Sequence, residues 1–132
     1  AIALARSMRA TSGRANMRPG DGRRTGASGA MCIGVLGHDY NLNDPYISLD
    51  LMNKIRRLGA SPVTASIYSH KEMARWERQR ARRGAKRLFW TYGRRLLGAA
   101  CRWLDTGEVD GIVHLMSFGC GPESFIAEVI QY

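Results

Sequence analysis

The stretch GIVHLMSFGCGPES, residues 111–124, decides the fold that we predict for this chain. Its first seven residues are rich in strand formers and follow an aspartate, so they predict a strand. Residues 118–121 then predict a tight turn, and Pro122 suits the first position of a helix. Apolar residues continue at helical spacing as far as Ile130. The stretch therefore predicts a strand, a turn and a helix, with Cys120 at the turn.

The position of Cys120 favours chemistry at its thiol. A thiol close to a helix N-terminus lies near the positive end of the helix dipole and near free backbone N–H groups, and both favour the thiolate. The neighbours Gly119 and Gly121 leave the sulfur open to approach. A single cysteine is more often a small buried hydrophobe. We expect that packing role for Cys32 and Cys101, and a chemical role for Cys120.

The composition is that of one small globular domain. The chain has 132 residues, of which 45% are hydrophobic, which is enough for a single core but not for two domains. Three cysteines without C-x-x-C spacing argue against a secreted disulfide scaffold and favour a reducing cytoplasm. No apolar run approaches the length of a membrane span, so we expect no membrane partner.

The net charge of +9 is concentrated in two segments. Residues 1–30 contain six arginines and one aspartate, and residues 70–87 contain eight lysines or arginines and two glutamates. Because the rest of the chain is nearly neutral, the charge argues only weakly for nucleic acid as a partner. We expect residues 1–30 to be a disordered basic tail or linker, and residues 31–132 to be the folded domain.

The first half of this domain predicts one strand and one helix. Residues 31–36 are a short apolar run typical of a buried strand, and residues 38–43 predict a polar loop at its C-terminal end. Asp44 and Pro45 predict the start of a helix that Gly59 ends.

The second half predicts a further strand and two helices before the deciding stretch. Residues 61–66 predict a short strand. Residues 70–86 predict a solvated helix, whose charges we interpret as a wet surface rather than a nucleic-acid site. Residues 88–104 predict a packed helix that Gly107 follows. The apolar stripe of this helix comprises Phe89, Gly93, Leu96, Leu97, Ala100, Trp103 and Leu104.

This order of elements predicts an α/β fold. Alternating strands and helices are typical of a small open parallel sheet with helices on both faces, Rossmann-like or flavodoxin-like. In such sheets, ligands bind at the C-terminal ends of the strands. We therefore expect Cys120 to lie in the same crevice as the loop at residues 38–43.

Other motifs leave two alternatives open. The chain has neither a phosphate loop nor the G-x-G-x-x-G pattern, and its cysteines and histidines lack zinc-finger spacing. The Gly119-Cys120-Gly121 turn is one residue shorter than a nucleophile elbow, and only the fold could bring His38 to Cys120 as a base. Cysteine-dependent acyl transfer with Cys120 as nucleophile is one alternative, and a non-catalytic interaction domain with a basic helix is the other.

The run SFGCGPES, residues 117–124, resembles the S-F-G-C-G-P-D-S segment of proteins related to the D-component of 2-hydroxyglutaryl-CoA dehydratase. Such proteins are often encoded with, or fused to, an acyl-CoA dehydratase activase. The resemblance continues in GHDYN at residues 37–41, DPY at 44–46 and LFWTYGRR at 88–95. Glu123 stands where aspartate is usual, and Asp39 where proline is common.

The resemblance implies an iron–sulfur component of a 2-hydroxyacyl-CoA dehydratase/reductase-like system. The component would receive low-potential electrons from an ATP-hydrolysing activator that carries its own cluster, and an acyl-CoA is one candidate substrate. Cys120 would be a ligand of a 4Fe-4S cluster, and the surrounding site would comprise Gly119, Gly121, His38, Tyr40 and Asn41. Because such a cluster needs several thiolates, we expect the other ligands outside this chain, which would be an inactive part of a longer cytoplasmic protein.

Overall fold

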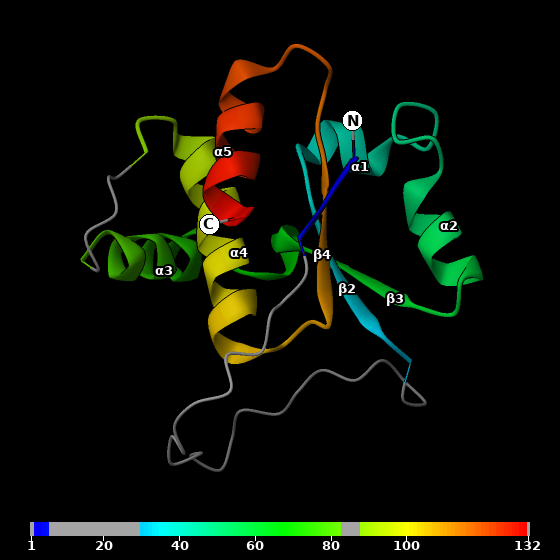
Figure 1. The fold of residues 1–132 in the computed structure, drawn as a ribbon, viewed down its shortest axis with the longest axis horizontal. Helices are drawn as coiled ribbons and strands as arrows, with labels where there is room; N and C mark the ends of the chain where they lie inside the picture. The colour runs from blue at the N-terminus through cyan, green and yellow to red at the C-terminus, as the bar shows by residue number, and fades with distance from the viewer. Residues whose placement is uncertain (1, 6–29, 83–87, 132) are drawn as a thin grey trace.

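The computed structural model describes residues 2–5, 30–82 and 88–131. Within them, four strands form one sheet in the order β1-β4-β2-β3 (Figure 1). The strands are β1 (Ile2–Ala5), β2 (Cys32–Leu36), β3 (Ser61–Thr64) and β4 (Gly111–Leu115). The strands β4, β2 and β3 run parallel, and β1 runs antiparallel to β4. The predicted α/β fold with a small open parallel sheet is confirmed.

Helices cover both faces of this sheet, as predicted (Figure 1). The helical elements are α1 (Asp39–Asn43), α2 (Leu51–Arg57), the 3-10 turn η1 (Ala65–Ile67), α3 (His70–Arg82), α4 (Thr91–Thr106) and α5 (Gly121–Gln131). In this described part of the chain, no helix is both long and apolar enough to cross a membrane.

Alternating side chains in the strands divide the core into two clusters. Leu36 and Ile112 pack on the side of α3, α4 and α5, in the larger cluster. Val35 and Val113 pack on the side of α1 and α2, in the smaller one. Each face of the sheet therefore has its own cluster of buried side chains, covered by its own set of helices.

Trp103 fixes α4 against the middle of the sheet. Its side chain is 1% exposed, and its indole N–H donates a hydrogen bond of 2.8 Å to the hydroxyl of Tyr68. A Cβ at Gly34 of β2 would lie 2.6 Å from the indole ring, so only glycine allows this approach. Because α4 is held here, its first turn lies at the C-terminal end of β2, beside the segment that follows that strand.

The beginning of the chain differs from the expectation of a disordered tail. Residues 2–5 form β1, which pairs with the edge of β4. The apolar Ile-Ala-Leu-Ala run can occupy that edge because the backbone groups of β4 would otherwise lack partners there. Residues 6–29, the rest of the predicted tail or linker, lie outside the described residues.

The segments after β2 also differ from the prediction. The predicted polar loop at residues 38–43 contains the short helix α1, and the helix predicted from Asp44 begins only at Leu51. Residues 44–50 form a turn in which Leu49 and Asp50 have φ of 52° and 57°. The Asp44 carboxylate accepts backbone N–H bonds inside this turn at 2.8 and 3.2 Å, so its capping capacity is used locally.

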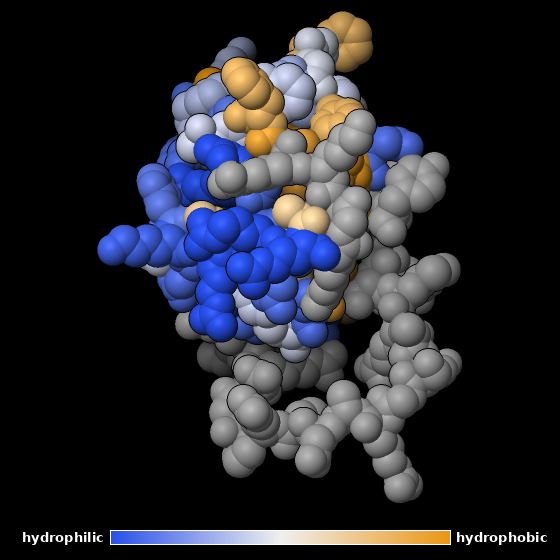
Figure 2. Space-filling model, turned by 90° about the vertical axis from the view of Figure 1, so that its left-hand side faces the viewer, coloured by the Kyte–Doolittle hydropathy of each residue, from blue (hydrophilic) through white to orange (hydrophobic). Residues whose placement is uncertain are grey.

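Helix α3 is less exposed than predicted. Hydrophilic side chains gather over the side of the molecule that α3 occupies (Figure 2), but Met73 and Glu77 are buried. A Cβ at Gly98 of α4 would lie 2.3 Å from the backbone oxygen of Met73, so the two helices are almost in backbone contact. Met73 and Glu77 are four residues apart and so share one helical face. This buried face was not predicted because most residues around it are charged.

Most of the apolar stripe predicted for residues 88–104 is confirmed. Gly93, Leu96, Leu97, Ala100 and Trp103 are buried, and Gly107 follows the helix in the left-handed conformation with φ of 66°. Phe89 is exposed because α4 begins only at Thr91, so Phe89 lies before the helical stripe.

Candidate functional site

The candidate site lies at the C-terminal ends of the two central strands. After β2 the chain turns to α1 and α2 on one face, and after β4 it turns to α5 on the other. The two connections diverge between neighbouring strands, which is the position where open α/β sheets bind ligands. His38 follows β2, and the glycine-flanked turn at residues 117–121 follows β4.

The imidazole of His38 is held by two tyrosine rings, one from α1 and one from α4. Its imidazole stacks on Tyr92 of α4 with ring centres 4.1 Å apart and planes at 15°, and on Tyr40 of α1 at 5.2 Å and 24°. Its Nε2 lies 3.4 Å from Oε1 of Glu123, an ion-pair distance without hydrogen-bond geometry. The side chain of His38 is 27% exposed, whereas that of Glu123 is 1% exposed. The imidazole is therefore oriented by the two tyrosine rings and the buried Glu123 carboxylate, and part of it is accessible to solvent.

Tyr92 and Arg95 fix the segment that carries His38. The Tyr92 hydroxyl donates to the carbonyl of Gly37 at 3.0 Å and accepts from the backbone N–H of Asp39 at 2.9 Å. Nη1 of Arg95 lies 3.3 Å from the Asp39 carboxylate. Burial, with the nearby Asp39 carboxylate as the next cause, raises the pKa of Tyr92. The hydroxyl consequently stays protonated at neutral pH and can make both hydrogen bonds.

Glu123 and Asn41 shape the turn that carries Cys120. The second Glu123 oxygen accepts the backbone N–H of Ser117 at 3.0 Å, and the amide of Asn41 donates to the Ser117 hydroxyl at 3.0 Å. The backbone N–H of Cys120 donates to the carbonyl of Ser117 at 3.2 Å. The turn is thus tied both to α5 and to the segment after β2.

The glycines around Cys120 leave space beside it. Gly119 has φ of 79°, a left-handed conformation that glycine adopts without strain. A Cβ at Gly119 or at Gly121 would meet no atom within 4 Å among the described residues. Cys120 itself is half-buried and forms no disulfide. The thiol is therefore at an open turn, as the sequence predicted.

Three buried side chains at this edge keep polar atoms without hydrogen-bond partners in the described part of the chain. These atoms are Oδ1 of Asn41, Oε1 of Glu123 and both ring nitrogens of His114. His114 is 3% exposed, and burial lowers its pKa; the Glu123 carboxylate opposes this shift and His38 adds to it. Buried polar atoms without partners are rare in folded proteins and mark sites of strain or function.

The structure brings the predicted site residues together. His38, Tyr40 and Asn41 lie after β2, and Gly119, Cys120 and Gly121 lie after β4, at one edge of the sheet. The prediction that the Cys120 turn and the segment at residues 38–43 lie at the same edge of the sheet is confirmed by the contacts of Asn41 and Glu123. Cys32 is buried at the start of β2 and Cys101 packs against the core from α4, as expected of packing residues.

Four residues of this site were not predicted from the sequence: Tyr92, Arg95, His114 and Glu123. Tyr92 and Arg95 lie in the LFWTYGRR run but carried no predicted role. His114 is the only ionisable residue in the apolar run from Gly111 to Met116, which was a usable signal. Glu123 was noted as standing where aspartate is usual, and its hydrogen bond back to the backbone of Ser117 could not be predicted from spacing alone.

A complete iron–sulfur cluster does not fit the ligands at this edge. Within residues 2–5, 30–82 and 88–131, no group of three or more His, Cys, Asp or Glu side chains is placed to hold a metal ion. All three cysteines of the chain lie in these ranges, and only Cys120 lies at this edge. One thiolate cannot ligate a cubane that needs several.

Comparison of the chain with protein-family models, with curated proteins and with solved structures found no match.

Proposed function

We propose that this chain is a component of an iron–sulfur dehydratase/reductase-like system, and that the edge carrying Cys120 is its working face. In this proposal Cys120 supplies one cluster ligand, and the other ligands come from outside this chain, from further sequence of the same protein or from a partner protein. An ATP-hydrolysing activator would deliver low-potential electrons to the assembled centre. The substrate class that accompanies this proposal is a 2-hydroxyacyl-CoA or a related acyl ester.

One observation carries the proposal: three of the four segments that support the family resemblance meet at one place. Tyr92 from residues 88–95 stacks on His38 from residues 37–41. His38 in turn lies beside Glu123 from residues 117–124. A resemblance due only to general α/β patterning would not be expected to select the contacting residues of one sheet edge.

The chemistry of the turn is compatible with a thiolate ligand. Helix α5 begins directly after Cys120, so its dipole and its first backbone N–H groups favour negative charge there. The open space beside Gly119 and Gly121 would allow a bulky group to approach the sulfur. Neither feature supplies a second ligand, which is why the proposal needs ligands from elsewhere.

Iron and acid-labile sulfide analysis without oxygen tests this proposal. We expect the 132-residue chain alone to hold little iron, and the longest product of its gene, or its complex with the activator, to hold iron and sulfide. Replacement Cys120→Ser should remove most of that iron, because a hard oxygen ligand suits the cluster poorly. The matched variant Cys101→Ser should retain it. Full iron content in Cys120→Ser, or no iron in any form of the protein, would refute the proposal.

A second candidate function is acyl transfer with Cys120 as nucleophile. The observation that favours it is the His38–Glu123 pair, since a carboxylate that orients a histidine is the usual support for a general base. The rate of Cys120 alkylation across pH tests this candidate. We expect His38→Gln to slow alkylation near neutral pH if His38 assists the thiol, and His70→Gln to leave the rate unchanged. Equal rates in both variants would exclude this function.

A further inference from the structure

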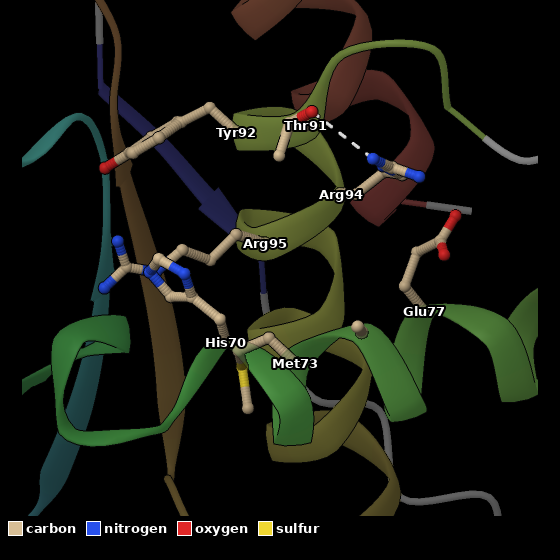
Figure 3. Close-up of a pocket in the computed structure, with 8 residues that line it drawn as sticks. His70, Met73, Glu77, Thr91, Tyr92, Arg94 and Arg95 are labelled. Carbon is tan, nitrogen blue, oxygen red and sulfur yellow. Dashed lines mark hydrogen bonds between the residues drawn. The ribbon is translucent and has the colours of Figure 1, made fainter.

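A cavity of about 410 Å³ lies between α3 and the first turns of α4 (Figure 3). Its volume falls within the range of about 300–1,000 Å³ that is typical of small-molecule sites. The Met73 and Ala74 side chains of α3 form an apolar part of its wall, opposite Arg94 and Arg95 of α4. The cavity therefore combines an apolar surface with two guanidinium groups.

Among the described residues, Arg95 has an acceptor for only one of its five hydrogen-bond donors. Its side chain is only 19% exposed, and its one polar partner among the described residues is the Asp39 carboxylate, at 3.3 Å. Its Nε is shielded from solvent and has no acceptor in the described part of the chain. A guanidinium presents five N–H donors and has no acceptor atoms. A cation that is mostly withdrawn from water and meets one acceptor is suited to bind a second oxyanion.

The electrostatics of one end of the cavity favour an anion. His70 is the first residue of α3 and Thr91 the first of α4, so the positive ends of two helix dipoles face the cavity. Figure 3 shows His70 and Arg95 on one side of the cavity and Arg94 and Glu77 on the other. An anion is therefore expected at the end of the cavity that holds Arg95 and the N-terminus of α3, away from the buried Glu77 carboxylate.

We propose that this cavity binds a small molecule with an oxyanion on an apolar body. The oxyanion, a carboxylate or a phosphate, contacts the guanidinium of Arg95, and the apolar body packs on Met73 and Ala74. This proposal is independent of any iron–sulfur cluster, because none of the residues that carry it lies at the Cys120 turn.

A ligand bound in this cavity would change the surroundings of His38 in the candidate site. Tyr92 and Arg95 both line the cavity. The Tyr92 hydroxyl bonds to the backbone of Gly37 and Asp39 on either side of His38, and Arg95 contacts the Asp39 carboxylate. An oxyanion on Arg95 competes with the Asp39 carboxylate for its donors. We therefore expect the ligand to change the environment of His38 without touching it.

Three probes distinguish the parts of the proposed ligand: hexanoate, its neutral analogue hexanol, and inorganic phosphate. Binding to the 132-residue chain is measured by chemical-shift changes of the backbone amides. We expect hexanoate to bind at least about tenfold more tightly than either of the other probes. Its largest shift changes should fall on residues of α3 and α4 that line the cavity and on residues 37–39.

Two variants and a control locate the site. Arg95→Gln should weaken hexanoate binding by about tenfold or more, because it removes the cation. Ala74→Phe should weaken it similarly by filling the apolar part of the cavity. Arg56→Gln, an exposed arginine of α2 on the other face of the sheet, should leave binding unchanged. Well-dispersed amide spectra identify the variants that are folded.

Four results would overturn the proposal. The first is no binding of hexanoate at millimolar concentration. The second is hexanol binding as tightly as hexanoate, which would remove the need for an oxyanion. The third is phosphate binding as tightly as hexanoate, which would remove the apolar body. The fourth is equal hexanoate affinity in Arg95→Gln and Arg56→Gln, which can be measured even if Ala74→Phe does not fold.

Discussion

His38 and Glu123, which follow two different strands of the sheet, meet at its C-terminal edge with Nε2 and Oε1 3.4 Å apart. The carboxylate is buried and its other oxygen holds the backbone of Ser117, so it cannot move toward solvent to find another partner. The histidine is fixed by stacking on Tyr92 and Tyr40. This contact joins the segment after β2 to the turn that carries Cys120.

Replacing Glu123 should destabilise the protein. Glu123→Ala leaves the Ser117 N–H without its acceptor, and we expect a loss of about 1–3 kcal/mol in the free energy of unfolding. Glu123→Gln can keep that hydrogen bond through its amide oxygen and should lose less. The matched variant Glu128→Ala, on the exposed side of the same helix, should stay within about 0.5 kcal/mol of the parent. Urea unfolding gives these values, and equal losses in Glu123→Ala and Glu128→Ala would contradict the assigned contact.

The Tyr92 hydroxyl should contribute more to the free energy of unfolding than the hydroxyl of an exposed tyrosine. Tyr92→Phe keeps the ring that stacks on His38 but removes the hydrogen bonds to Gly37 and Asp39. We expect a cost of about 1–3 kcal/mol, since two backbone groups lose a partner. Tyr46→Phe, at an exposed tyrosine, should cost no more than about 0.5 kcal/mol. If both variants unfold at the same urea concentration, the hydroxyl does not support this segment.

His114 should make stability depend on pH. Burial lowers its pKa in the folded protein, so below its ordinary pKa of 6.5 the unfolded chain binds a proton that the folded protein does not. Stability contributed by the neutral side chain is therefore present above pH 6.5 and is lost as pH falls below it, at no more than about 1.4 kcal/mol per pH unit for one proton. Glu123 and His38 face the same group and act in opposite directions on it.

The variant His114→Leu tests this dependence. Unfolding by urea at several pH values between neutral and mildly acidic should show a flatter profile for His114→Leu than for the parent. His70→Gln, which removes an exposed histidine, should keep the slope of the parent. A slope that is unchanged in His114→Leu would assign the acid sensitivity to other groups.

Gly98 should be required for the contact between α3 and α4. In an open helix, glycine to alanine stabilises by about 1 kcal/mol. At Gly98 the new Cβ would lie 2.3 Å from the backbone oxygen of Met73, so we expect Gly98→Ala to destabilise by about 1–3 kcal/mol instead. Gly121→Ala, at a helical glycine with no neighbouring atom within 4 Å among the described residues, should be neutral or stabilising. The same sign in both variants, measured by urea unfolding, would show that α3 is not packed as closely as the structure has it.

The sequence predicted local elements best where one pattern dominates. The apolar run 31–36 and the stretch 111–124 predicted the two central strands and the turn before α5, because continuous β-formers and a Gly-Pro break leave few alternatives. Residues 44–50 were predicted as helix because Asp44-Pro45 is a common helix start. The structure forms a turn there, since the Asp44 carboxylate bonds to the backbone N–H groups of the next residues.

The alternation of strands and helices in the sequence was sufficient to determine an α/β fold and to place His38 and Cys120 at the same edge of a parallel sheet. That inference follows from chain direction alone, since every parallel strand ends at the same edge. The partners at that edge were decided only by the tertiary structure. Tyr92 reaches His38 because Gly34 admits Trp103 and so sets the position of α4 against the sheet. Glu123 reaches both His38 and Ser117 from α5, whose Ile126 packs closely on Gly93 of α4. Such contacts depend on distances between layers, which no local pattern of residues encodes.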